Sequence, residues 1–126
     1  MRRLLSVLGL CTLAACAGGE SYERQYLVFF GQGSASLDDA SQAVVTRVAQ
    51  RAQHHPDQIV SVEGYARQNG DLSGEALLAT QRAKAVTQQL VADGVSETRI
   101  QQTTRPPSNA EGVVGARRVE IELLPR

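Results

Sequence analysis

Charged side chains gather where a predicted strand gives way to a predicted helix, between residues 59 and 82. The segment Ile59-Val60-Ser61-Val62-Glu63-Gly64-Tyr65 alternates apolar and polar positions, which is typical of a strand. Arg67, Asp71 and Glu75 then lie in a turn and at the start of a helix, and Arg82 lies further along that helix. Such groups bind charged ligands, a guanidinium for a carboxylate and a carboxylate for an ammonium. Because strand ends and helix N-termini meet at one edge of a sheet, we take this corner as the candidate binding site.

The rest of the sequence argues against several other kinds of function. It contains no recognisable Ser-His-Asp order, phosphate-binding loop or pair of carboxylates beside an apolar pocket, so we expect no catalysis. His54 and His55 point about 100° apart on a helix and have no Cys, Asp or Glu at ligand spacing, so we expect no metal and no other cofactor. The net charge is zero, which argues against binding to nucleic acid.

The first sixteen residues have the pattern of an export signal. A basic start, Met1-Arg2-Arg3, precedes an apolar core, residues 4–12, that is too short to span a bilayer. Leu13-Ala14-Ala15-Cys16 resembles the lipobox of bacterial lipoproteins, which implies a signal peptide at residues 1–15 and a lipidated Cys16 that begins a tether at residues 16–25. The alternative is an ordinary signal peptide whose cleavage site adjoins a cysteine. Removal of the signal would leave 11 basic and 13 acidic residues, a formal charge of −2.

Position 17 bears on where a lipidated chain would be located. Two or three acyl chains hold a protein to a membrane far better than one, so Cys16 predicts permanent membrane attachment. Ala17 stands where an Asp would retain a Gram-negative lipoprotein in the inner membrane. By resemblance to that sorting rule, we expect a lipid-anchored protein on the periplasmic face of the outer membrane.

The predicted elements after the tether alternate between strands and helices. Residues 26–30 form an apolar run that predicts a strand covered on both faces, and a helix capped by Asp38 follows until His54-His55-Pro56. The second helix ends at Gly94, where a left-handed residue is expected, and Arg82 is predicted to lie off its buried stripe. Residues 100–103 form a weak strand candidate, residues 105–114 a loop and residues 119–123 a half-buried strand. The apolar stripes of the two helices are Ala40, Val44, Val45, Val48 and Ala52, and Ala79, Ala83, Val86 and Leu90.

This order predicts an α+β fold of two layers, βαβαββ, with both helices on one face of a mixed sheet. A run of short motifs in order resembles the OmpA-like carboxy-terminal domain over about residues 26–124, and we assign the domain to residues 26–126. With the lipobox, the chain resembles a peptidoglycan-associated lipoprotein. The motifs are Val62-Glu63-Gly64, Gly70, Leu78, Arg82-Ala83-Lys84-Ala85-Val86, Leu90, Gly94-Val95, Arg99-Ile100 and Arg117-Arg118-Val119-Glu120-Ile121.

The resemblance implies non-covalent attachment to peptidoglycan through the diaminopimelate of its stem peptide. In the family, an aspartate at the end of the second strand accepts the ligand ammonium, and an arginine fifteen residues later binds a ligand carboxylate. Here the arginine is present as Arg82, but Arg67 stands at the aspartate position. A second family aspartate, in the loop after the first strand, falls at Gly33, after Gln32. Both carboxylates are therefore missing.

These differences leave alternatives open. Asp71 or Glu75 could supply the missing carboxylate, or Arg67 could pair on the surface with Glu63, Asp71 or Glu75. We expect Arg82 to be the main ligand contact, so that Arg82→Ala weakens binding with little effect on stability. Two arginines without their usual carboxylates should prefer a dicarboxylate, which predicts weak or lost wall binding. The alternative function is a degenerate module that has lost wall binding and binds an envelope protein or another anion through Arg67, Arg82 and Arg117 or Arg118.

Overall fold

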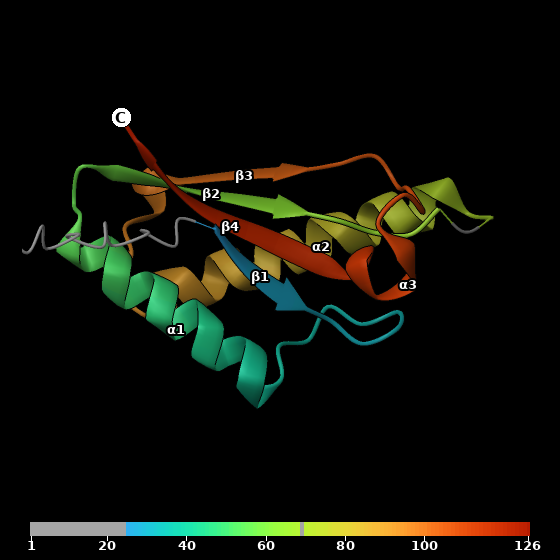
Figure 1. The fold of residues 1–126 in the computed structure, drawn as a ribbon, viewed down its shortest axis with the longest axis horizontal. Coiled ribbons are helices and arrows are strands. Elements are labelled where there is room, and N and C mark those ends of the chain that lie inside the picture. Colours follow the sequence, from blue (N-terminus) through green and yellow to red (C-terminus); the bar gives the residue numbers. More distant parts are fainter. Residues whose placement is uncertain (1–24, 69) are drawn as a thin grey trace, which may run out of the picture.

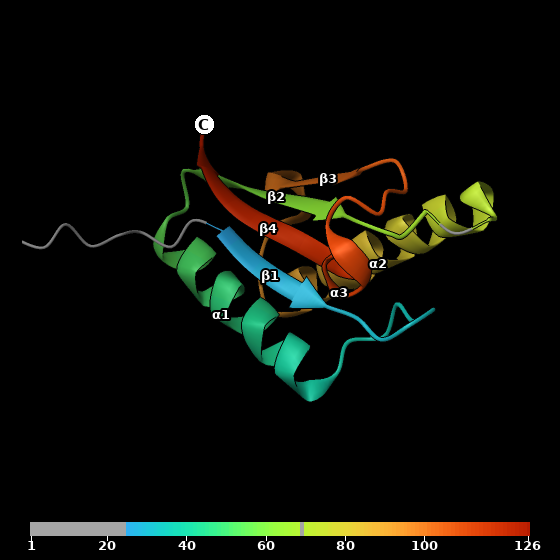
Figure 2. The ribbon, with the colours of Figure 1, turned by 45° about the vertical axis from the view of Figure 1, so that its right-hand side comes forward.

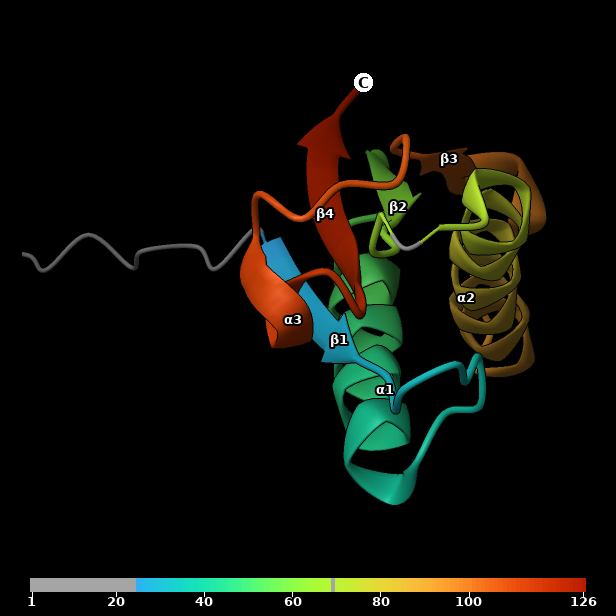
Figure 3. The ribbon, with the colours of Figure 1, turned by 90° about the vertical axis from the view of Figure 1, so that its right-hand side faces the viewer.

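Four strands form one mixed sheet, and the two long helices pack on one of its faces (Figures 1 and 3). The computed structural model describes residues 25–68 and 70–126, so the predicted signal peptide, the lipobox and all but the last residue of the predicted tether lie outside the described residues. The elements are β1 (Gln25–Phe29), α1 (Asp39–His54), β2 (Gln58–Gly64), α2 (Leu72–Ala92), η1 (Glu97–Arg99), β3 (Ile100–Thr104), α3 (Gly112–Gly115) and β4 (Arg118–Pro125).

The strand order is β1-β4-β2-β3. β4 pairs antiparallel with both β1 and β2, and β3 pairs parallel with β2. The core combines the inward residues of the strands, such as Val62 and Ile121, with those of both helices, such as Val45 and Val86. The predicted α+β fold with two layers is therefore confirmed.

The helix boundaries follow the predicted signals. Asp38 caps α1, since its Oδ1 accepts a hydrogen bond of 2.7 Å from the Ser41 amide, and this bond lowers the pKa of Asp38. Gly94 ends α2 with a φ of 101°, and the amide after it, Val95 N, donates to Leu90 O at 3.0 Å. The stripe of α1 is buried at Val45, Val48 and Ala52 and half-buried at Val44, but Ala40 is exposed. Ser41 is buried in its place, and its hydroxyl donates to Phe29 O.

The prediction that the first strand is covered on both faces is wrong. β1 lies at the edge of the sheet, and Leu27 and Phe29 are each 43% exposed on the face away from the helices. Tyr26, Val28 and Phe30 are buried on the other face. The run of apolar residues therefore reflects one buried face and one open face, because both long helices cover the same side of the sheet.

The end of the sheet beyond the ends of β1 and β2 brings several loops together (Figures 1 and 2). The β1–α1 loop, the start of α2 and α3 all lie at this end. Residues 105–114, predicted as a loop, also contain the start of α3. Asn109 ties this segment to the β2–α2 loop, since its side chain accepts from Gln68 N at 3.1 Å and donates to Gln68 O at 2.9 Å. Within the described ranges, no helix is both long enough and apolar enough to cross a bilayer.

Candidate functional site

A cavity of about 150 Å³ opens at this end of the sheet, between the β1–α1 loop, the β2–α2 loop, α2 and the residue before β4. We call it the arginine pocket. Four of the five predicted ligand-binding residues line it, while Asp71 does not. Asp71 instead caps α2, because its Oδ1 accepts a hydrogen bond of 3.0 Å from Gly74 N. The pocket is lined by Gln32, Gly33, Arg67, Glu75, Leu78, Arg82 and Arg117.

Arg82 is the most buried residue of the pocket, with 1% of its surface exposed. The prediction that it lies off the buried stripe of α2 is wrong. Its Nε donates to Ser34 O at 2.9 Å, and its Nη2 donates to Gly31 O at 3.3 Å. Its Nη1 donates to Tyr65 O at 3.2 Å. The guanidinium therefore ties the β1–α1 loop to the end of β2, and the carbonyls of these segments make its burial possible.

The charge of Arg82 is sensitive to its neighbours. Burial lowers its pKa, and so does the nearby Arg117, whereas the charge of Glu75 acts in the opposite direction. Arginine nevertheless stays protonated in proteins at physiological pH. A guanidinium has five N–H donors, and three of those of Arg82 reach backbone carbonyls. Arg82 is thus chiefly a structural residue that also presents positive charge to the pocket.

Arg67 differs from Arg82 in its hydrogen bonding. Its Nε is buried and has no hydrogen-bond partner among the described residues. Two of the three proposed surface partners of Arg67 have other contacts, since Glu63 pairs with Arg105 at 2.9 Å and Asp71 caps α2, while the third, Glu75, lines the pocket. Buried donors without a partner are rare in native proteins. Arg67 also lines the pocket, so its guanidinium can pair with an anionic ligand group.

Arg117 and Glu75 complete the charges of the pocket. Arg117 Nε donates to Phe30 O at 3.2 Å, and the backbone of Arg117 accepts from Phe30 N at 2.8 Å. Glu75 is the one carboxylate among the lining residues. Three arginines against one glutamate give the pocket a formal charge of +2. The arrangement can therefore bind anionic groups, and it offers a single carboxylate for a ligand cation.

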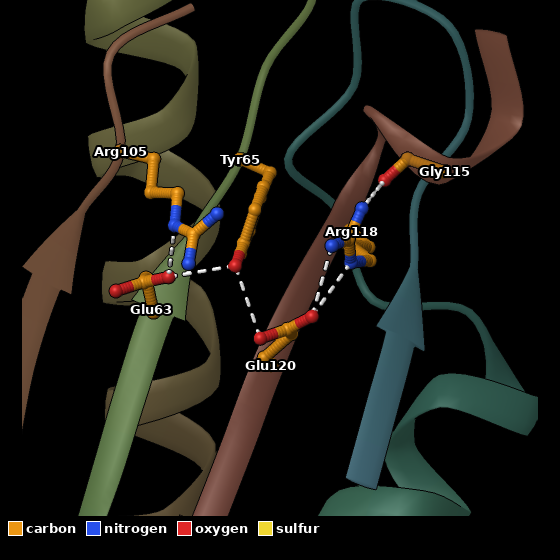
Figure 4. Close-up of polar contacts among 6 residues, drawn as sticks. All are labelled: Glu63, Tyr65, Arg105, Gly115, Arg118 and Glu120. Atoms are coloured by element: carbon orange, nitrogen blue, oxygen red, sulfur yellow. Dashed lines mark hydrogen bonds and ion pairs between the residues drawn. The ribbon is translucent and has the colours of Figure 1, made fainter. Parts of the chain in front are cut away.

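A second charged cluster, which we did not predict, lies on the open face of the sheet (Figure 4). The Tyr65 hydroxyl contacts Glu63 Oε1 at 2.7 Å and Glu120 Oε2 at 3.0 Å. Arg105 and Arg118 lie over the Tyr65 ring, with their Cζ atoms 5.2 and 3.9 Å from its centroid. The alternation of β2 and β4 indicated that both glutamates face away from the helices, but only the pairing of the two strands brings them opposite each other.

Because of Tyr65, we expect the stability of the protein to decrease at alkaline pH. Burial raises the pKa of Tyr65 well above its usual value of 10, with hydrogen bonds to Glu63 and Glu120 as further causes. A raised pKa in the folded state means that the stabilisation is present below pH 10 and is lost as the pH rises further. We expect the melting temperature to fall above pH 10 in the wild type and to fall less in Tyr65→Phe.

At neutral pH, Tyr65→Phe should also cost about 1–2 kcal/mol, because Glu63 and Glu120 then face each other without the hydroxyl between them. Thermal melts from pH 7 to pH 11 measure both effects. If the melting temperature falls equally steeply above pH 10 in both proteins, the fold does not raise the pKa of Tyr65.

The described residues hold no group of three or more His, Cys, Asp or Glu side chains that could bind a metal ion. His54 lies at the end of α1 and His55 caps it. The hydrogen-bonding side chains gathered at the candidate site are three guanidinium groups, one carboxylate and the amide of Gln32. Their chemistry is that of electrostatic binding.

The chain is similar in sequence to one protein family and to several known proteins. The OmpA family model matches residues 29–114. The probable lipoprotein YiaD of Escherichia coli is 35% identical over 105 residues, which cover 78% of this chain and 48% of YiaD. The peptidoglycan-binding protein ArfA of Mycobacterium tuberculosis is 38% identical over 101 residues, which cover 75% of this chain and 31% of ArfA. The chain thus spans about half the length of YiaD and a third of ArfA.

Two solved structures show the same fold. The peptidoglycan-associated lipoprotein of Burkholderia pseudomallei has a TM-score of 0.70 at 22% identity, covering 77% of this chain and 88% of that one. The C-terminal domain of Helicobacter pylori MotB has a TM-score of 0.71 at 20% identity, covering 80% and 85%.

Proposed function

This chain belongs to the OmpA family, and we propose that it associates non-covalently with peptidoglycan through the arginine pocket. The observation that carries the proposal is the placement of Arg67, Arg82, Arg117 and Glu75 around one cavity at the end of the sheet. Peptidoglycan stem peptides offer carboxylates and ammonium groups, which are the partners that these side chains bind. The name of the relative ArfA, a peptidoglycan-binding protein, supports the same ligand.

We further propose that the chain is lipidated on Cys16 and anchored in the outer membrane, with the domain on the periplasmic face. The lipobox motif supports this, as does the name of the relative YiaD, a probable lipoprotein. The geometry is compatible with it, because the described chain enters β1 at Gln25, and the loop after the other end of β1 (Figure 1) contributes Gln32 and Gly33 to the pocket. An anchor before Gln25 would leave the pocket on the side of the domain away from the membrane.

The lipid anchor leads to a prediction about Cys16. We expect Cys16→Ser to move the protein from the membrane fraction to the soluble periplasmic fraction, because the substitution removes the acylated thiol. Fractionation and mass spectrometry of the mature N-terminus measure the result. Retention of Cys16→Ser in the membrane, without a lipid mass on Cys16 in the wild type, would rule out this anchor.

Binding of the diaminopimelate centre should be weak in this pocket. A zwitterionic centre needs an anion for its ammonium, and Glu75 is the one carboxylate in the lining. Arg67 repels the ammonium from the position where the family places an aspartate. We therefore propose wall association with reduced affinity for diaminopimelate.

Arg67→Asp should strengthen the binding of a stem peptide that contains diaminopimelate by about 1.5–3 kcal/mol. The physical reason is that a repelled ammonium gains a charge-assisted hydrogen bond. Calorimetric titration of the peptide and co-sedimentation with purified sacculi measure the change. Arg47→Asp is the matched control, since it makes the same change of charge at an exposed position of α1 outside the pocket. Tight binding by the wild type that Arg67→Asp abolishes would show that diaminopimelate binds with its carboxylate on Arg67.

The second candidate function is a module that has lost wall binding and binds an envelope protein. The observation that favours it is the arginine at position 67, which removes the family carboxylate. Sedimentation with sacculi separates the two, because this module would stay in the supernatant at every protein concentration. We propose no catalytic activity for either function, since the pocket holds arginines and a single carboxylate rather than a nucleophile and its base.

A further inference from the structure

The three arginines of the pocket differ in how many of their N–H donors the protein itself uses. Arg82 places three donors on backbone carbonyls, and Arg117 places its Nε on Phe30 O. Arg67 Nε has no acceptor among the described residues although it is buried. The protein thus uses most of Arg82 for its own structure, and Arg67 and Arg117 keep donors for a ligand.

The charge of the pocket points to the charge of that ligand. Arg67, Arg82 and Arg117 face one carboxylate, Glu75, so a ligand with two negative charges would neutralise the pocket. Desolvated charges are stable in proteins only when they are paired and hydrogen-bonded. An ammonium on the ligand would add a positive charge to a site that already has an excess of them.

The volume of the pocket limits the size of the group that enters. The cavity has a volume of about 150 Å³. Pockets for whole drug-sized ligands are larger, from about 300 Å³ upward. The cavity therefore accepts a small dianion or the end of a longer molecule.

We propose that the arginine pocket selects a ligand with two carboxylates and no ammonium between them, and that the guanidinium of Arg67, which lines the pocket, donates to one of these carboxylates. Guanidinium groups bind carboxylates with planar, paired hydrogen bonds, which suits Arg67 and Arg117 as two arginines that line one cavity. This inference rests on the proposed function in that it assigns a ligand class to the same pocket. The dicarboxylate can belong to the cell wall or to a free small molecule.

The test compares small probes that differ by one group each. Glutarate carries two carboxylates, glutamate adds one ammonium, and the monoamide of glutarate lacks one carboxylate. Each is titrated into the purified chain by NMR or calorimetry, and inorganic phosphate is titrated as a dianion that is not a carboxylate. We expect glutarate to bind at least about tenfold more tightly than glutamate or the monoamide, because each change removes or opposes a charge-assisted contact. The preference should weaken with added salt.

Arg67→Gln tests the role of Arg67, and Arg47→Gln on the exposed face of α1 is its control. We expect Arg67→Gln to remove the preference for glutarate and Arg47→Gln to keep it, with melting temperatures showing that both variants are folded. Equal or tighter binding of glutamate, equal binding by Arg67→Gln, tighter binding of phosphate or no binding of glutarate would each overturn the inference.

The same experiment separates this inference from the proposed function. Sacculi are sedimented with the chain in the presence and absence of glutarate. Release of the chain from sacculi by glutarate would support both. Sedimentation of the chain without any binding of glutarate would overturn the dicarboxylate assignment and leave wall binding in place. Binding of glutarate by a chain that does not sediment would overturn wall binding and identify a free dicarboxylate as the ligand.

Discussion

Arg82→Met is expected to lower the free energy of unfolding by about 2–4 kcal/mol. Methionine keeps much of the apolar length of the side chain but leaves Ser34 O and Tyr65 O without their donor, and leaves Gly31 O with the Ser34 amide alone. Each hydrogen bond to a charged donor contributes about 1.5–3 kcal/mol, and release of the buried charge offsets part of the sum. Urea unfolding followed by circular dichroism measures the change. This expectation replaces the one from the sequence, in which Arg82 affected binding and left stability unchanged.

Two further variants show whether the geometry of Arg82 matters as well as its charge. Arg82→Lys keeps the charge, but one ammonium cannot reproduce the planar set of donors that reaches three carbonyls, so most of the loss should remain. Lys84→Met is the matched control, because Lys84 is a cation two residues further along α2 and is exposed. It should change stability by less than about 0.5 kcal/mol. An Arg82→Met protein as stable as the wild type would mean that the loop carbonyls find other donors.

The burial of Arg82 shows where prediction from the sequence stops. The periodicity of α2 identified Ala79, Ala83, Val86 and Leu90 as its buried stripe, and all four are buried. A charged residue beside such a stripe is normally placed in solvent. The carbonyls that receive Arg82 come from segments up to 51 residues away, and no local pattern in α2 contains that information.

The residues of the pocket that come from the β2–α2 corner were easier to predict than the residue contributed by the segment before β4. Arg67, Glu75 and Arg82 come from one corner of the chain, so strand and helix signals sufficed to place them together. The sequence did not decide whether Arg117 or Arg118 contributes to the binding site. In the structure the two neighbouring side chains lie in different clusters. Arg117 lines the pocket, whereas Arg118 contacts Glu120 at 2.9 Å on the open face of the sheet. Which of the two faces the pocket depends on how β4 pairs with β1 and β2.

Gly64→Ala is expected to destabilise the protein by about 2–4 kcal/mol, although it adds a single methyl group. Gly64 lies at the end of β2 and is buried against α2. A Cβ there would collide with the backbone carbonyl oxygen of Ala79 and would lie 3.1 Å from the Cβ of Ala83. Because a backbone atom of the helix cannot rotate away, α2 must shift as a body, and overpacking of this kind costs about 1–3 kcal/mol or more. Urea unfolding measures the loss.

Gly31→Ala is the matched control, because its added Cβ would meet only Ser34 Cβ, at an ordinary contact distance of 3.7 Å. It should change stability by less than about 1 kcal/mol. Ala83→Gly should not rescue Gly64→Ala, since it removes a side chain and leaves the backbone oxygen of Ala79 in place. Full rescue would show that the clash lies elsewhere.

The shift of α2 should also reach the ligand site, because α2 carries Glu75 and Arg82. Arg82 also donates to the carbonyl of Tyr65, the residue after Gly64. Any Gly64→Ala protein that remains folded should therefore bind the pocket's ligand more weakly than Gly31→Ala does.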